Sequence, residues 1–153
     1  ADAAELQRDW GISGLFDTFR DTVRDADIVS LHVPANAETR HLINSESLAY
    51  MPSQARLINT SRGAVVDEVA LFRALADGTL AGAALDVFAT EPYEPRDARF
   101  DLRRLPNVLL TPHVSSSTVE ACAQVAAASV QNIRAALAAD LDQVSLVNRA
   151  LLC

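Results

Sequence analysis

The chain has 153 residues, half of them hydrophobic, and a formal net charge of −7. This length and apolar content are sufficient for one compact domain with a buried core. The acidic balance and the lack of a basic stripe argue against nucleic acid or an anionic membrane as the main partner. The sequence has no apolar run as long as a transmembrane helix and no recognisable signal peptide.

The cysteines and histidines indicate neither disulfides nor a metal site. Cys122 and Cys153 are isolated in the sequence, without a CxxC pair or any metal-ligand spacing. They are typical of reduced thiols in a cytosolic protein, so we expect a cytoplasmic location. The three histidines have no clustered carboxylates beside them, and we therefore expect no bound metal.

Apolar periodicity predicts an alternation of helices and strands along the chain. In chain order, the expected elements are a helix at 4–10, a helix at 18–26, a strand at 27–33, a helix at 45–51, a strand at 55–60, a helix at 68–77, a strand at 80–88, a strand at 107–111 and a helix at 117–139. The loop at 89–106 is long for a connector, which suggests a working surface.

Capping residues support four of these helices. The expected N-caps are Asp17, Ser45, Asp67 and Ser117, the last in a capping box with Glu120. Gly78 is expected to end the helix that Asp67 begins.

Strands that alternate with helices predict an α/β fold with a parallel sheet and helices on both faces. Ligands bind such sheets beyond the carboxyl ends of the strands. Four candidate groups lie at or just past the end of a predicted strand: His32, residues 60–62, Asp86 and His113. We therefore expect these groups to gather in one crevice.

Arg62 is the strongest candidate for binding a substrate anion. It follows the hydroxyls of Thr60 and Ser61 at the end of an apolar strand and precedes Gly63. Its guanidinium is a planar fork of donors suited to bidentate binding of a carboxylate. A surface ion pair is the alternative, but the strand end, the hydroxyls and the glycine favour the functional interpretation.

A histidine and two carboxylates complete the candidate set. The imidazole of His113 suits proton exchange near neutral pH, whereas His41 is more readily explained as a structural or solvated residue. For His32 the alternative is a strand-end residue whose backbone, and not its ring, lines a pocket. Glu91 is a candidate to orient His113 and favour its protonated form, although a loop glutamate is usually just solvated. Asp86 ends an apolar strand and needs donors there, either as a turn or cap residue or against a cofactor amide.

An anion-binding arginine, a proton-donating histidine and a glutamate behind it suit the reduction of a 2-oxo acid. The arginine holds the carboxylate and polarises the carbonyl, and the histidine protonates its oxygen as hydride arrives at carbon. Because no side chain supplies hydride, this chemistry requires a nicotinamide cofactor.

Four segments resemble, in order and spacing, the D-isomer-specific 2-hydroxyacid dehydrogenases. They are "DADIVSLHVPANAETRHLIN" (25–44), "LINTSRGAVVDE" (57–68), "LAGAALDVFATEP" (80–92) and "LPNVLLTPHVSSST" (105–118). The family includes phosphoglycerate dehydrogenases, glyoxylate/hydroxypyruvate reductases and the C-terminal-binding-protein corepressors. Four ordered motifs make the resemblance highly specific.

The resemblance implies roles for individual residues. It implies that Arg62 binds substrate, that His113 is the acid/base and that Glu91 is its carboxylate partner. The residues it implies on the cofactor side are Val33, Pro34, Thr39, Thr60, Ser61, Arg62, Asp86, His113, Ser115 and Ser116. Many family members have Gly or Ala at the last two positions, but a serine still offers its backbone N–H. The implied cofactor is NAD, with NADP as the alternative.

A G-x-G-x-x-G turn is absent, and Gly11 and Gly14 do not form one. We therefore expect a partial Rossmann-like, doubly wound parallel sheet that lacks the first βαβ phosphate-binding unit. Residues 1–139 would be the C-terminal part of a dinucleotide-binding domain, with 117–139 as an interdomain helix. Residues 140–153 would return toward a largely missing substrate domain. By itself such a fragment is expected to be inactive, and the parent protein to be a homodimer.

Two functions remain open from the sequence. The first is an NAD(P)-dependent oxidoreductase that interconverts a D-2-hydroxy acid and its 2-oxo acid. The second is an NAD(H)-sensing regulator similar to the corepressors, for which no partner-docking signature is visible. A serine hydrolase is rejected because the sequence has no G-x-S-x-G elbow.

Overall fold

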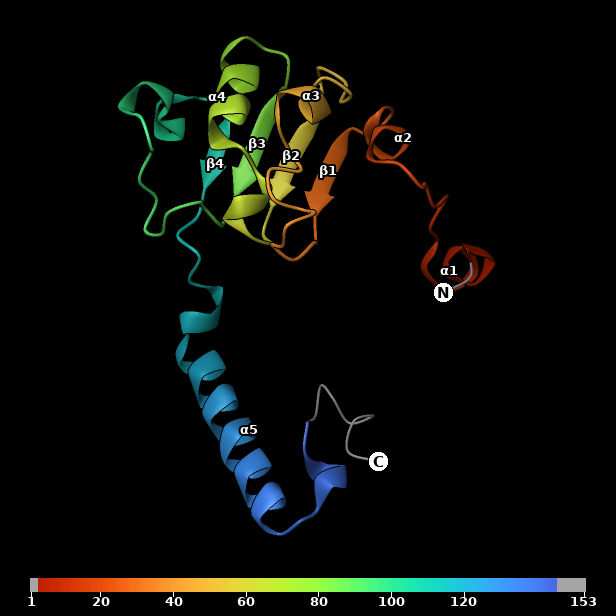
Figure 1. Ribbon diagram of the computed structural model, residues 1–153, viewed down its shortest axis with the longest axis vertical. Helices are drawn as coiled ribbons and strands as arrows, with labels where there is room; N and C mark the ends of the chain where they lie inside the picture. The colour runs from red at the N-terminus through yellow and green to blue at the C-terminus, as the bar shows by residue number, and fades with distance from the viewer. Residues whose placement is uncertain (1–2, 146–153) are drawn as a thin grey trace. The chain divides into compact units, whose positions relative to one another are not determined.

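The computed structural model describes residues 3–145 and divides into two units, the first ending at Pro112 and the second beginning at His113 (Figure 1). The first unit contains the sheet and the second contains one long helix. Within the described residues, no helix is both long enough and apolar enough to cross a membrane.

The sheet has four parallel strands in the order in which they occur along the chain. They are β1 (Ile28–Leu31), β2 (Arg56–Asn59), β3 (Gly82–Leu85) and β4 (Val108–Leu110). Ser30 lies opposite Ile58, Ile58 opposite Ala84, and Ala84 opposite Leu109. The predicted α/β class and the predicted parallel sheet are confirmed, with each strand shorter than its expected range.

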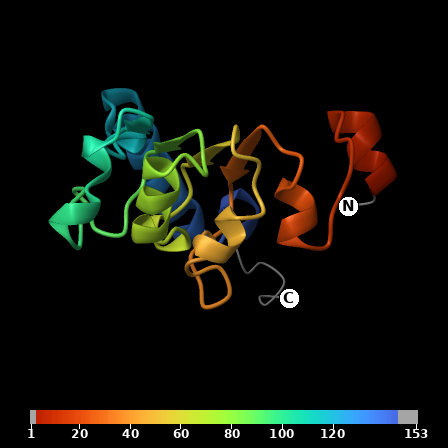
Figure 2. The same cartoon turned by 90° about the horizontal axis from the view of Figure 1, so that it is seen from above.

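The helices of the first unit that flank the strands pack on one face of the sheet (Figure 2). These helices are α2 (Phe19–Val23), α3 (Ser45–Leu48) and α4 (Glu68–Ala76). Each new strand is added on the same side of the last one, and right-handed connections then place every crossover helix on the same face. Helices on both faces, as predicted, are therefore not found within this unit.

The two faces of the sheet differ in burial because side chains alternate along each strand. On the helix-covered face, Leu31, Leu57 and Leu85 are buried in one core cluster with residues of the three helices. On the opposite face, Ile28 and Leu109 are 61% and 63% exposed. The core thus lies on the face of the sheet that α2, α3 and α4 cover.

The start of α4 agrees with the sequence prediction. The Asp67 carboxylate accepts hydrogen bonds from the Val69 and Ala70 amides, and Gly78 follows the helix with a φ of +78°. A positive φ is readily adopted by glycine, which explains its place at the helix end.

The other three predicted caps are wrong by one residue. Thr18 caps α2 instead of Asp17, Asn44 caps α3 instead of Ser45, and Thr118 caps α5 (Val119–Leu137) instead of Ser117. In each case the acceptor one position away reaches the first free amides of the helix. The Asn44 case is clearest, because its amide oxygen accepts from Glu46 and Ser47 while the Ser47 hydroxyl accepts from the Asn44 amide.

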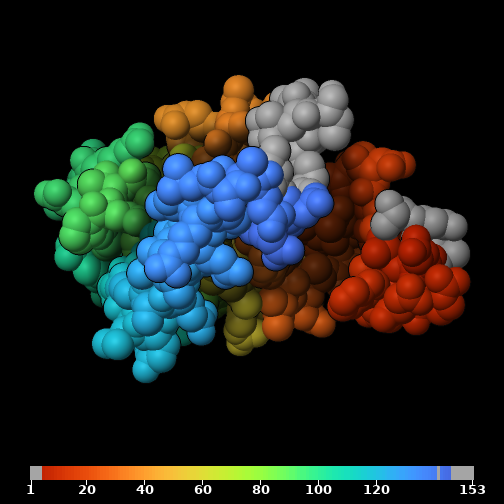
Figure 3. All heavy atoms as spheres, turned by 90° about the horizontal axis from the view of Figure 1, so that it is seen from below, coloured from red at the N-terminus to blue at the C-terminus, as the bar shows by residue number. Residues whose placement is uncertain are grey.

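The second unit is built around α5. A 3₁₀ helix, η4 (Ser115–Ser117), precedes α5, and another, η5 (Leu141–Gln143), follows it. No side chain of α5 is buried, and Val119 and Leu137 are 82% and 84% exposed. In Figure 3 the atoms of α5 are coloured from cyan to blue. At the other end of the chain lies α1 (Ala3–Trp10). Most of the predicted tail, residues 146–153, falls outside the described residues.

Gly63 lies where two strand-end loops touch. It begins the 3₁₀ helix η1 (Gly63–Val65), and a Cβ on it would lie 1.9 Å from the Phe88 carbonyl carbon and 2.0 Å from the Phe88 oxygen. Since these are backbone atoms, the space cannot be recovered by moving a side chain. The position thus requires glycine because of a close approach between backbones.

Gly63→Ala is expected to lower the free energy of unfolding by about 1–3 kcal/mol, as overpacking of a close contact does. Urea denaturation measures the change. Gly14→Ala is the control, because a Cβ added at Gly14 would lie 3.5 Å from the Phe16 ring, an ordinary contact distance. Equal stability of the two variants would contradict this role of Gly63.

Candidate active site

The carboxyl ends of β1 and β2 enclose an open depression of about 450 Å³. Its lining residues are His32, Val33, Pro34, Ala35, Ser61 and Arg62. All of them closely follow a strand, so four predicted site residues, Val33, Pro34, Ser61 and Arg62, are brought together. Thr60 is exposed and is not among the lining residues.

Arg62 leaves the turn after β2 in an extended conformation, with φ −147° and ψ 140°. Its side chain is exposed, and its Nη1 donates to the Ser61 carbonyl at 2.6 Å. The turn itself is held by Asn59, a fully buried residue that the sequence reasoning passed over. The signal was available, because alternation along β2 puts Asn59 on the same buried face as Leu57.

Thr39 shapes the loop after β1 instead of lining the depression. Its hydroxyl donates to the Pro34 carbonyl and accepts from the Asn36 amide at 2.9 Å. Thr39, a predicted cofactor-side residue, thus stabilises the conformation of the loop that carries Val33 and Pro34. His32, on the same loop, lies with its Nε2 2.9 Å from the Ser30 hydroxyl.

Asp86 follows β3 and has the donor that a carboxylate at a strand end requires. The Thr111 hydroxyl, from the residue after β4, donates to the Asp86 carboxylate. The Asp86 amide donates to the Asn59 carbonyl at 3.0 Å, which continues the β2–β3 ladder. Thr111 was not predicted, although it occupies the strand-end position in "LLTPH" that Asp86 occupies in "ALDVF".

Glu91 lies in a loop that is tied to the rest of the first unit. The Phe88 amide donates to Glu91 Oε1 at 3.0 Å, and the Ala89 amide donates to Glu68 Oε1 at 2.8 Å. Phe88 and Ala89 also make the close backbone contact with Gly63. The segments that carry Arg62 and Glu91 are therefore packed against each other.

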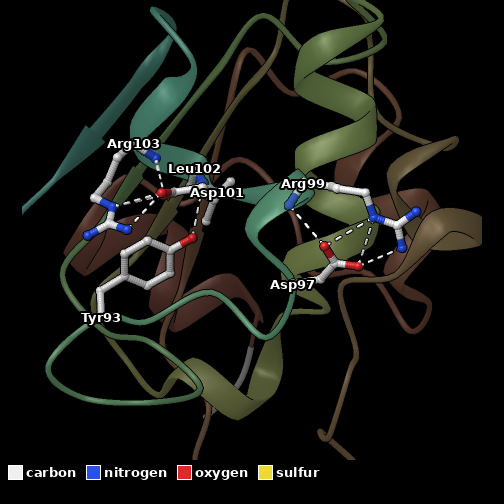
Figure 4. Close-up of polar contacts among 6 residues, drawn as sticks. All are labelled: Tyr93, Asp97, Arg99, Asp101, Leu102 and Arg103. Carbon is white, nitrogen blue, oxygen red and sulfur yellow. Dashed lines mark hydrogen bonds and ion pairs between the residues drawn. The ribbon is translucent and has the colours of Figure 1, made fainter.

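The rest of the loop after Glu91 contains two similar pairs of charged residues (Figure 4). Asp97 binds the guanidinium of Arg99, and Asp101 that of Arg103, with shortest distances of 2.6 and 2.7 Å. Each aspartate also caps a 3₁₀ helix, η2 (Ala98–Phe100) and η3 (Leu102–Arg104). The hydrogen bonds from Arg99 lower the pKa of Asp97 to about 2. The predicted loop is thus stabilised by ion pairs and helix caps within itself.

His113, Ser115 and Ser116 belong to the second unit, whereas Arg62 and Glu91 belong to the first. The structure consequently describes the two groups separately. His113 has a φ of 52°, and both serines lie in η4. Among the described residues, no group of three or more His, Cys, Asp or Glu side chains is placed to hold a metal ion.

Glu68 is a half-buried carboxylate that supports the Glu91 loop. Burial raises its pKa, and the hydrogen bond from the Ala89 amide opposes part of that rise. The charges of Arg96 and His41 also lower its pKa, while that of Asp67 raises it. Because the pKa is raised in the folded state, ionised Glu68 lowers the free energy of unfolding at neutral pH. This destabilisation decreases as the pH falls through the pKa of the folded state, and it is absent below the pKa of the unfolded state.

Glu68→Gln is expected to become more stable relative to wild type as the pH rises from about 4 to 7, because glutamine keeps the acceptor for Ala89 without the buried charge. Urea denaturation of both proteins across this range measures the difference. Glu68→Ala, which removes the acceptor, should cost about 1–2 kcal/mol at neutral pH. A pH-independent difference between Glu68→Gln and wild type would contradict the assignment.

Comparison with known proteins decides the family. The family model described as "D-isomer specific 2-hydroxyacid dehydrogenase, NAD binding domain" matches residues 6–115. The chain belongs to this family. The resemblance seen in the four sequence motifs is thereby confirmed, and NAD as the expected cofactor agrees with the description of the family.

Two curated relatives illustrate the similarity. The glyoxylate reductase of Thermofilum pendens is 42% identical over 153 residues, which cover 97% of this chain and 44% of the relative. The D-3-phosphoglycerate dehydrogenase of a Synechocystis species is 49% identical over 111 residues, covering 72% of this chain and 19% of the relative. The chain therefore spans less than half the length of these relatives.

A solved structure of another protein has a similar fold. The crystal structure of D-lactate dehydrogenase from Aquifex aeolicus, complexed with NAD and lactic acid, matches with a TM-score of 0.72 and 32% identity. The match covers 85% of this chain and 43% of the other. The Rossmann-like α/β fold expected from the sequence is confirmed.

Proposed function

We propose that the complete gene product is an NAD-dependent oxidoreductase that interconverts a D-2-hydroxy acid and its 2-oxo acid. The observation that carries this proposal is the placement of Arg62 at the rim of the depression after β1 and β2. An exposed guanidinium there can bind an anionic substrate next to a cofactor, and the family match makes that cofactor NAD. Assembly as a homodimer is part of the same proposal.

Arg62 and His113 divide the work on the substrate. The guanidinium of Arg62 binds the carboxylate and polarises the adjacent carbonyl. Protonated His113 donates its proton to the carbonyl oxygen during reduction and accepts it back during oxidation. The carboxylate of Glu91 is the partner of His113 in this proposal and orients the ring. The hydrogen bond from the Phe88 amide supports this role, because it fixes the Glu91 side chain on its loop.

The residues of the depression fit a dinucleotide that lies beyond the strand ends. Val33 and Pro34 provide an apolar wall for the adenosine side, and Thr39 holds their loop in shape. The remaining residues proposed to hold the cofactor are Thr60, Ser61, Asp86, His113, Ser115 and Ser116. When bound, the nicotinamide supplies or accepts the hydride. The carboxylate of Asp86, held by Thr111, offers an acceptor to the carboxamide.

The substrate class follows from what Arg62 and His113 recognise. A carboxylate next to a carbonyl is common to all 2-oxo acids, and relatives are named glyoxylate reductase, glyoxylate/hydroxypyruvate reductase and D-3-phosphoglycerate dehydrogenase. We propose small 2-oxo acids such as glyoxylate as the first substrates to test.

Arg62→Lys is expected to lower kcat/KM for the 2-oxo acid by about 10–10²-fold, because lysine cannot form the bidentate bond. NADH oxidation with glyoxylate, hydroxypyruvate, pyruvate and bulkier 2-oxo acids measures the effect in the complete gene product. Arg104→Lys is the control, since Arg104 is exposed and lies outside the depression. Unchanged kinetics for Arg62→Lys would refute substrate binding by Arg62.

His113→Asn is expected to lower kcat by about 10²–10⁴-fold, because the variant has no group to exchange the proton. His41→Asn is a matched control: both histidines have a φ of 52°, a conformation that asparagine tolerates. Tight NADH binding without turnover of any 2-oxo acid by the wild type would instead favour the NAD(H)-sensing regulator.

A further inference from the structure

Asn59 is a buried polar side chain at the end of β2. It is 0% exposed, and it lies on the face of the sheet that packs against the helices. Burying an amide without hydrogen-bond partners is unfavourable, because the group loses its bonds to water. Among the described residues, however, no buried side-chain nitrogen or oxygen lacks a hydrogen-bond partner. The amide of Asn59 is therefore retained in the core for the bonds that it makes.

The bonds of this amide all go to the turn that carries Arg62. Asn59 Oδ1 accepts from the Ser61 amide at 3.0 Å and from the Ser61 hydroxyl at 2.8 Å. Asn59 Nδ2 donates to the Arg62 carbonyl at 3.0 Å. One rigid side chain thus holds the turn at two successive residues, from the inside of the protein.

The same turn is fixed on its other side. Gly63, the next residue, is pressed against the backbone of Phe88. The backbone carbonyl of Asn59 accepts from the Asp86 amide at 3.0 Å, which ties the end of β2 to the end of β3. The Arg62 backbone is therefore held both before and after the residue, while its guanidinium remains exposed at the depression.

We propose that Asn59 is a positioning residue, which sets the direction of Arg62 toward the substrate through its side-chain bonds to Ser61 and Arg62. This inference rests on the proposed function of Arg62 as the substrate-binding group. It assigns a role in that reaction to a fully buried residue that does not contact the substrate.

Asparagine is the side chain that fits this position. An aspartate would accept from Ser61 but would turn a negative charge toward the Arg62 carbonyl instead of a donor. A leucine of similar size would fill the space and leave the Ser61 amide and the Arg62 carbonyl without their partner. Asn59→Asp and Asn59→Leu thus remove one or both sets of bonds without opening a large cavity.

Asn107 offers a matched control in the same sheet. Its Nδ2 also donates to two backbone carbonyls, those of Leu75 and Ala81, at 3.2 and 3.3 Å. It is half-buried and precedes β4, at the amino end of the strands and away from the depression. Asn107→Leu therefore removes comparable backbone bonds without touching the turn at Arg62.

The first test is the kinetics of the complete gene product with a 2-oxo acid and NADH. Asn59→Leu and Asn59→Asp are expected to lower kcat/KM on the order of 10²-fold, the size of effect that a misplaced binding group produces. The kcat/KM of Asn107→Leu should remain within about twofold of wild type, even if its Tm falls as far as the Tm of the Asn59 variants. Asn59 variants that lose no more activity than Asn107→Leu would overturn the inference.

A double-mutant cycle separates positioning from general stability. If Asn59 acts through Arg62, Asn59→Leu should cost little further kcat/KM in an Arg62→Lys background. Fully additive losses would show that Asn59 affects turnover by another route, and would overturn the inference.

Amide hydrogen exchange gives a readout that needs no turnover. In Asn59→Leu the Ser61 amide should lose protection, whereas the Asp86 amide, bonded to the Asn59 backbone, should keep it. Retained protection at Ser61 would refute the inference. Failure of the proposed function would look different, since the wild type itself would then turn over no 2-oxo acid.

Discussion

The backbone contact between Gly63 and Phe88 is the constraint on which the candidate site depends. Only hydrogen occupies the side of Gly63 that faces the Phe88 carbonyl, so the loops after β2 and β3 lie against each other. One loop carries Arg62 and the other carries Glu91. The bonds from Ala89 to Glu68 and from Phe88 to Glu91 hold the second loop in that place. The site is consequently a contact between two loops, supported from the core by Asn59 on one side and by α4 on the other.

The order of the strands explains where the chemistry gathers. Four parallel strands added in one direction align their carboxyl ends along one edge, and ligands bind such sheets beyond that edge. The residues that follow the strands include His32, Thr60, Asp86 and Thr111, so polar side chains gather at this edge of the sheet. One face of the sheet is covered by helices because right-handed crossovers all fall on that side. The carboxyl ends of the strands thus lie at one edge of the first unit, where the depression lined by Arg62 opens.

Local patterns were reliable for the elements and less reliable at their ends. Asp67 was identified as a cap because a single acceptor stands before a clear helical period, and the structure agrees. The sequence predicts Ser45 as the cap of α3, whereas Asn44 is the cap, because only the geometry of the turn decides which side chain reaches the helix amides. The sequence does not predict the role of Asn59, because its hydrogen-bond partners cannot be identified from a polar residue within an apolar run. Its bonds to Ser61 and Arg62 depend on the turn closing back over the end of β2.

The sequence by itself determined the parallel α/β fold, the family and the identity of the candidate residues, because period-two and helical alternation and ordered motifs are local properties of the chain. Only the tertiary structure decided that α2, α3 and α4 share one face of the sheet, that Thr111 holds Asp86 and that Glu68 holds the loop of Glu91. These features depend on pairs such as Glu68 and Ala89, which are 21 residues apart in the sequence and meet only after the strands are aligned. Hydrogen-bond partners at such separations leave no local pattern, since each is selected by the position of the other in space.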